Sequence, residues 1–199
     1  KHVSSEEILS LKQKFGLTEE DFVIGFCGRL VKDKGVAELA EGFKLICERN
    51  PDKRIKLLII GVPERRDAVS HDVFEILNNN PNVIFTGRIP YQDIQKYYLL
   101  MNVFILPSHR DGLGLAPLEA QAMGVPALVT QITGCKETIL ENVTGNYVDL
   151  TGESVCAQVE KYFDDERVKA FGQNARVFVE KNFEHEKFKG LMLDFINSL

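Results

Sequence analysis

Two positively charged side chains follow the first apolar segment of the chain. Arg29 and Lys34 lie in the stretch Gly28-Arg29-Leu30-Val31-Lys32-Asp33-Lys34-Gly35, between a segment that predicts a strand and one that predicts a helix. Glycines let the backbone turn tightly, and the start of a helix offers N–H groups to an anion. Arginine can hold a phosphate with two donors, and lysine acts as a point charge. The stretch therefore predicts a phosphate site, with a solvated surface loop as the alternative.

Two carboxylates stand in a second glycine-containing segment. Asp111 and Glu119 bracket the turn into a predicted helix that carries Pro117 in its first turn, and Gly112 and Gly114 expose backbone before that turn. A carboxylate only accepts hydrogen bonds, so Glu119 can take both hydroxyls of a ribose diol. Paired carboxylates also suit glycosyl chemistry. The alternative for Glu119 is a simple partner of the helix dipole.

The elements that must position these residues alternate along the chain. Near-continuous apolar runs predict strands that are buried on both faces, as in a parallel sheet. Helical segments between them predict a doubly wound, Rossmann-like α/β sheet with helices on both faces, whose ligands bind at the carboxyl ends of the strands. The expected strands cover 22–27, 55–60, 83–85, 103–106 and 127–129, and the expected helices cover 4–15, 36–49, 67–77, 91–101, 115–123 and 153–199.

The 199 residues predict one domain. It comprises an entry linker and helix at 1–21, an α/β core at 22–150 and C-terminal helices at 151–199. The composition, 44% apolar and 27% charged, is that of a soluble globular protein, and a net charge of −5 gives no support for a nucleic-acid surface. No stretch reaches the length of a membrane span and no signal core is present, so we expect a cytoplasmic protein. The four cysteines lack metal-site spacing and are expected to be reduced core residues.

These motifs together resemble the C-terminal domain of the retaining glycosyltransferases of family 4, which have the two-domain GT-B fold. The matching features run from about Phe22 to Phe183 and occur in the order that is usual in the family. They are Gly28-Arg29-Leu30 with Lys34-Gly35, Thr86-Gly87-Arg88, the block from Pro107 to Pro126, Gly134-Cys135-Lys136-Glu137, and the turn from Asn142 to Val148.

The resemblance implies roles for individual residues around a nucleotide-sugar donor. Arg29 and Lys34 would hold the donor diphosphate, Glu119 the ribose hydroxyls, and Asp111 would lie at the hexose. The family usually has glutamate at the position of Asp111, which leaves the contact of this acid with the donor open. The other expected donor-binding residues are Gly28, Ile89 beside the base, Gly112, Leu113, Gly114, and Leu115 and Ala116, whose N–H groups would meet the diphosphate.

The implied activity is transfer of a hexose from a UDP-, GDP- or ADP-sugar to an acceptor hydroxyl with retention, without a metal or other cofactor, in bacterial polysaccharide or glycan synthesis. The glycan or lipid-linked acceptor would bind an N-terminal domain that we expect this chain to lack, and the full-length enzyme would act at the inner face of the membrane. The alternatives are a GT-B-fold sugar-nucleotide epimerase and a non-catalytic nucleotide-sugar-binding module. His109 and Glu137 are interpreted as a surface residue and a structural residue at a helix start.

Overall fold

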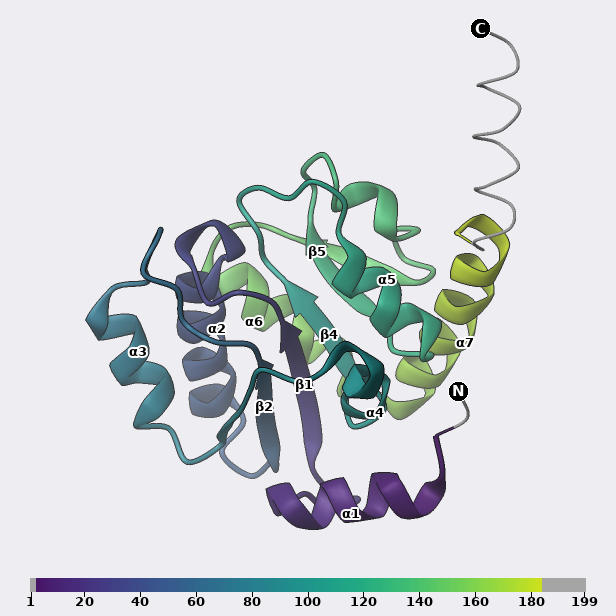
Figure 1. The fold of residues 1–199 in the computed structure, drawn as a ribbon, viewed down its shortest axis with the longest axis horizontal. Helices are drawn as coiled ribbons and strands as arrows, with labels where there is room; N and C mark the ends of the chain where they lie inside the picture. Colours follow the sequence, from purple (N-terminus) through teal and green to yellow (C-terminus); the bar gives the residue numbers. More distant parts are fainter. Residues whose placement is uncertain (1–2, 184–199) are drawn as a thin grey trace, which may run out of the picture.

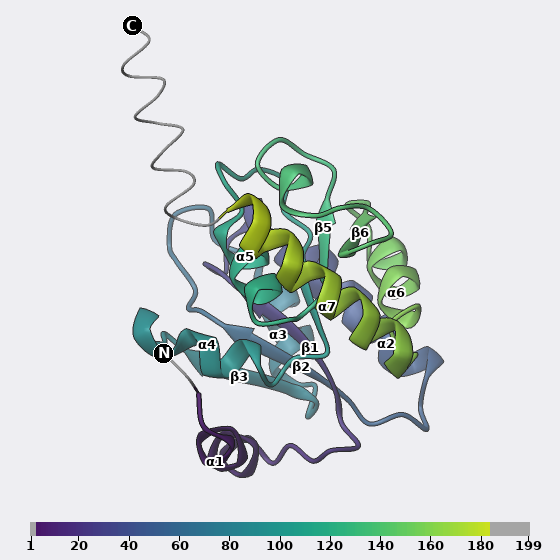
Figure 2. The ribbon, with the colours of Figure 1, turned by 90° about the vertical axis from the view of Figure 1, so that its right-hand side faces the viewer.

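The computed structural model describes residues 3–183 and shows a parallel six-stranded sheet between two layers of helices (Figures 1 and 2). The strand order is β3-β2-β1-β4-β5-β6, which confirms the predicted doubly wound, Rossmann-like fold. The strands are β1 (Phe22–Cys27), β2 (Ile55–Ile60), β3 (Val83–Gly87), β4 (Val103–Leu106), β5 (Ala127–Thr130) and β6 (Gly145–Val148).

The apolar runs form strands because helices cover both faces of the sheet. Adjacent residues along a strand point to opposite faces, yet Leu57, Leu58 and Ile59 of β2 are all fully buried. One layer contains α3 (His71–Asn78), α2 (Val36–Arg49) and α6 (Gly152–Glu160). The other contains α4 (Ile94–Tyr98), α5 (Leu115–Ala122) and α7 (Asp165–Asn182), and α1 (Ser5–Phe15) packs against α4.

The sheet reverses its winding direction between β1 and β4. β1 pairs with β2 along its whole length, from Phe22–Ile55 to Cys27–Ile60, and the chain continues outward to β3. It then returns to the other side of β1, where β4 pairs with only Ile24 and Gly25. The loops that follow β1 and β4 therefore leave the sheet at a topological switch point, where ligands bind in open α/β sheets.

Two predicted helices are shorter in the structure than in the sequence pattern. The helix expected over 67–77 begins only at His71, because Asp67 has a positive φ of 58° and its carboxylate accepts a hydrogen bond from the Asp33 N–H at 2.9 Å. The helix expected over 91–101 starts as a single 3-10 turn, and its α-helical part ends at Tyr98. At Asp67 a hydrogen bond to the loop after β1 replaces the expected helix start, and at Tyr91–Asp93 a 3-10 turn does so.

The C-terminal helical segment is divided into two helices. α6 ends at Glu160, and α7 begins after Asp164, whose carboxylate caps the Glu166 N–H at 3.0 Å. The remainder of the predicted helical extension, residues 184–199, lies outside the described residues. Within 3–183, no helix combines the length and the apolar content that crossing a membrane requires.

Candidate functional site

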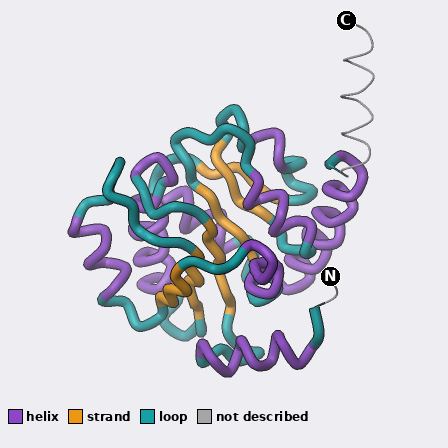
Figure 3. Tube along the Cα trace, viewed as in Figure 1, coloured by secondary structure: helices purple, strands orange, loops and turns teal. Residues whose placement is uncertain are grey.

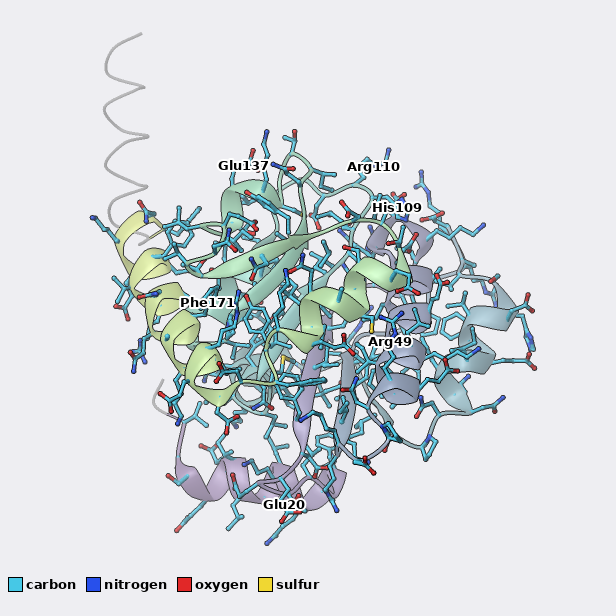
Figure 4. All side chains as sticks on the ribbon, turned by 180° about the vertical axis from the view of Figure 1, so that it is seen from behind. Glu20, Arg49, His109, Arg110, Glu137 and Phe171 are labelled. Atoms are coloured by element: carbon cyan, nitrogen blue, oxygen red, sulfur yellow. The ribbon has the colours of Figure 1, made fainter. Side chains whose placement is uncertain are left out.

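The predicted site residues lie at the carboxyl end of the sheet, on the loops that gather there (Figure 3) and in the first two turns of α5. Seen from behind in Figure 4, His109, Arg110 and Glu137 lie at this end, whereas Glu20, which precedes β1, lies at the opposite end. The loops after β1 and β4 are joined here. The His109 N–H donates to the Asp33 carbonyl at 2.8 Å, and the Ser108 hydroxyl lies 2.8 Å from the same oxygen. The two loops therefore form one bonded unit across the switch point.

Gly35 permits this close approach of the two loops. Its φ is +68°, a conformation that side chains rarely adopt, and a Cβ at this position would overlap the Pro107 carbonyl oxygen. A larger residue would have to push the loop after β1 away from the loop after β4. The glycine that ends the first predicted phosphate motif therefore has a structural role in bringing two site loops together.

Replacing Gly35 by alanine is expected to lower the free energy of unfolding by about 2–4 kcal/mol, because backbone strain and overlap with Pro107 add. Urea denaturation measures this loss. The matched control is Gly16→Ala, since Gly16 has a similar φ of +63° but open space around its Cβ position. That control should lose only about 1–2 kcal/mol. Equal losses in the two variants would contradict a specific contact between the loops.

Lys34 and Asp111 form an ion pair across the two loops. Lys34 Nζ lies 2.6 Å from Asp111 Oδ2, and the two side chains are only 15% and 14% exposed. The other carboxylate oxygen of Asp111 accepts the Gly112 N–H at 2.9 Å. Two residues that the sequence assigns to different parts of a donor are thus direct partners, and both oxygens of Asp111 are engaged.

Arg29 turns to a different loop. Its guanidinium lies 3.1 Å from Glu64 Oε2, in the loop after β2, and its side chain is 58% exposed. It lies on the wall of a cavity of about 250 Å³ together with Gly28, Ile89 and Arg88. The structure therefore gathers Gly28, Arg29 and Ile89 around one cavity, while Lys34 faces the loop after β4.

The loop before α5 is held by backbone contacts. The Gly114 N–H donates to the Gly134 carbonyl at 2.7 Å. The Leu115 N–H donates to the Leu113 carbonyl at 2.7 Å, so this predicted phosphate donor is engaged within its own loop. Ala116 is the second residue of α5, so its N–H has no acceptor within the helix. Of the two predicted phosphate donors, Leu115 and Ala116, only the Ala116 N–H is therefore available. The side chains of Leu113 and Leu115 are both more than half exposed.

Glu119 lies apart from the Lys34–Asp111 pair and has partners of its own. Its Oε2 accepts a hydrogen bond from the Tyr98 hydroxyl at 2.8 Å, and the Cys27 thiol lies near this hydroxyl. Glu119 and Tyr98 line a cavity of about 340 Å³ between α4 and α5. Within 3–183, no hydrogen bond joins Glu119 to Asp111, so the two acids do not form a directly bonded pair.

Tyr98 is the residue of this group that sequence reasoning missed. Its position in the helix expected over 91–101 gives no sign of a role in the site, and the structure buries it to 1% exposure. A buried phenol nevertheless needs a hydrogen-bond partner, and this requirement was the available signal. Burial raises the pKa of Tyr98 far above its usual range, so the hydroxyl remains protonated and donates to Glu119.

The remaining candidates have structural partners. His109 Nε2 lies 2.9 Å from Glu38 Oε1, on α2, and Glu137 accepts the Gly134 N–H at 2.9 Å. All four cysteines are free thiols. Burial, with a smaller contribution from Asp111, raises the pKa of the Cys135 thiol near the site to about 11. This cysteine is therefore protonated at neutral pH and is a weak nucleophile.

A comparison with known families identifies the family of this chain. The family model for glycosyl transferases group 1 matches residues 7–178, most of the chain. The chain belongs to this family. The group 1 domain is 36% identical over 179 residues to the capsular polysaccharide biosynthesis glycosyltransferase CapM of Staphylococcus aureus. It is 29% identical over 192 residues to the GDP-mannose-dependent monoacylated alpha-(1-6)-phosphatidylinositol monomannoside mannosyltransferase of Corynebacterium glutamicum.

The matched regions comprise about half of these relatives. The alignment with CapM covers 88% of this chain and 46% of CapM, and that with the mannosyltransferase covers 91% and 48%. Among solved structures, HepE of Anabaena, determined in complex with UDP and glucose, gives a TM-score of 0.83 at 18% identity, over 99% of this chain and 53% of HepE. The C-terminal domain of LpcC of Francisella tularensis gives 0.73 at 22% identity, over 82% and 87%. These likenesses establish the fold of the group 1 domain as one half of a GT-B structure.

Proposed function

We propose that the group 1 domain is the donor-binding half of a retaining hexosyltransferase of family 4. Residues 22–150 would form the nucleotide-sugar-binding core, with the entry segment at 1–21 and the helices at 151–199 packed around it. A second domain outside this chain would bind a glycan or lipid-linked acceptor. The full-length enzyme would work in the cytoplasm, at the inner face of the membrane, and contribute to polysaccharide or glycan synthesis. The names of the relatives support this, since one makes a capsule and another acts on a phosphatidylinositol mannoside.

The observation that carries the proposal is the Lys34–Asp111 pair at the switch point of the sheet. A partly buried lysine paired with Asp111, in the loop that leads into α5, is suited to an anion, because the Ala116 N–H at the start of α5 adds a partial positive charge. In the proposed complex, Lys34 binds the diphosphate, and its ion pair with Asp111 is broken. The carboxylate of Asp111 then turns to the hexose, while Gly112 and Gly114 keep the backbone close to the donor.

The chemical step would use Lys34 and Arg29 as fixed positive charges. The bond between the anomeric carbon and the diphosphate oxygen breaks, and both electrons go to the diphosphate. The acceptor oxygen replaces it on the same face of the sugar, and the acceptor proton leaves with the diphosphate. Positive charges that are already in place stabilise the charge that develops on the leaving group. Because these side chains supply the charge, we propose that the reaction needs no metal.

The function is tested by separating binding from transfer. The isolated domain is expected to bind one of UDP-, GDP- or ADP-hexose and to transfer no sugar, because closure of two domains normally completes such a site and excludes water. A thermal-shift panel identifies the donor, since a ligand at 100 times its Kd stabilises by about 2.7 kcal/mol. Efficient transfer by residues 1–199 alone would contradict the division into two halves.

The full-length enzyme provides the remaining readouts. The anomeric configuration of the product, measured by NMR, is expected to match that of the donor, and an inverted product would refute retention. EDTA is expected to leave the rate unchanged, and loss of activity that Mg²⁺ restores would refute the metal-free proposal. Interconversion of free UDP-hexose isomers without an acceptor would indicate the epimerase alternative.

A further inference from the structure

The strongest unexplained feature is the polar cluster beneath Glu119, in an otherwise apolar layer. Tyr98 ends α4, Glu119 lies in the second turn of α5, and Cys27 ends β1, so three elements meet at one hydroxyl group. α4 and α5 are in contact (Figure 1). Burying a phenol here has a free-energy cost unless its hydrogen bond compensates for it. Packing alone would be served as well by phenylalanine.

The direction of the hydrogen bond is determined by the chemistry of the partners. An ionised carboxylate can only accept, and Tyr98 has a single O–H to donate. The hydroxyl proton therefore points to Glu119 Oε2, 2.8 Å away. Burial raises the pKa of Cys27 to about 11, which keeps this thiol protonated as well.

The arrangement leaves one carboxylate oxygen for a ligand. Among residues 3–183, Glu119 Oε1 has no hydrogen-bond partner, and it is not among the buried unpaired polar atoms, so it is open to the cavity between α4 and α5. A carboxylate with one oxygen held cannot rotate freely about its last bond. Its remaining lone pairs then point in a constant direction, which is what recognition of two adjacent hydroxyl groups requires.

We propose that Tyr98 is a positioning residue that orients Glu119 and thereby lets the site distinguish ribonucleotides from deoxyribonucleotides. The inference rests on the proposed function, in which Glu119 meets the donor ribose. Tyr98 itself need not touch the sugar. Its hydroxyl acts through Glu119, while its ring packs at 6.0 Å from the ring of Phe104.

The experiment compares binding ratios. UDP, GDP and ADP are each titrated against the domain with their 2′-deoxy counterparts, and the pair that binds most tightly is used. Tyr98→Phe keeps the ring and removes only the hydroxyl. The ratio of ribonucleotide to deoxyribonucleotide affinity is expected to fall about threefold to tenfold, the effect of one hydrogen bond. Affinity for inorganic pyrophosphate, which has no ribose, should remain unchanged.

The neighbouring residue offers a matched control. Tyr97 lies on the same helix and is 7% exposed, but within residues 3–183 no hydrogen bond joins its hydroxyl to Glu119. Tyr97→Phe should keep the wild-type ratio. A wild-type ratio in Tyr98→Phe, combined with a collapsed ratio in Glu119→Gln, would overturn the inference and leave the proposed function intact. A ratio that Glu119→Gln does not change would refute the ribose role of Glu119, and the inference with it.

A second measurement covers the case that Tyr98→Phe fails to fold. In the unaltered protein, the buried Tyr98 hydroxyl proton is expected to give a slowly exchanging NMR signal that Glu119→Gln shifts. Adding the ribonucleoside diphosphate should shift this signal more than adding the deoxy form. The absence of a protected hydroxyl signal, or equal shifts with both ligands, would overturn the inference.

Discussion

Lys34→Ala is expected to weaken nucleoside diphosphate binding by about 1.5–3 kcal/mol, or roughly 10- to 150-fold. The side chain is 15% exposed and makes a charge-assisted contact of 2.6 Å, so the charge is held in place before the ligand arrives. The variant also leaves the Asp111 carboxylate without its cation, next to the incoming diphosphate. Isothermal titration calorimetry with the diphosphate and with the corresponding nucleoside measures the effect. Nucleoside binding should hardly change.

Variants of two other basic residues of the same loop test whether the effect depends on the position of Lys34 or only on its positive charge. Lys32→Ala removes the same charge from an exposed site two residues away and should change affinity less than about threefold. Arg29→Ala should cost about 1 kcal/mol, because that side chain is 58% exposed and already paired with Glu64. If nucleoside and nucleoside diphosphate lost affinity equally in Lys34→Ala, the diphosphate role would be wrong.

Asp111→Asn and Glu119→Gln are expected to have opposite effects on the nucleoside diphosphate. Asp111→Asn removes a negative charge that competes for Lys34, so the diphosphate should bind up to about 1 kcal/mol more tightly. The full nucleotide sugar should bind about 1–3 kcal/mol more weakly, because the contact to the hexose is lost. Glu119→Gln should weaken both ligands by about 1–3 kcal/mol. Calorimetry with both ligands on both variants gives the comparison.

Asp111→Glu serves as the control for this pair of acids. It retains the carboxylate and restores the residue that is usual in the family, so the nucleotide sugar should bind as it does to the wild type. The assigned roles would be wrong if Asp111→Asn weakened both ligands equally. They would also be wrong if Glu119→Gln weakened neither.

Much of the architecture was readable from local patterns. Five of the six strands coincide with apolar runs. In β1, β2, β4 and β5 this follows from burial on both faces, which favours apolar residues, whereas the edge strand β3 is only half-buried. The predicted place of the candidate site followed from the rule that loops at the carboxyl ends of parallel strands bind ligands. Helix ends were less accurate. The helix α3 starts four residues late because Asp67 bonds to Asp33, 34 residues earlier in the chain, and no periodicity reports such a contact.

The sequence by itself therefore determined the fold class, the family motifs and the residue types available at the carboxyl edge of the sheet. Only the tertiary structure decided which of these residues are partners. It pairs Lys34 with Asp111, 77 positions later, and Tyr98 with Glu119, 21 positions later. It also pairs Arg29 with Glu64. The physical reason is that strand and helix patterns depend on neighbours in the chain. Ion pairs and buried hydrogen bonds depend on which loops the sheet order brings together.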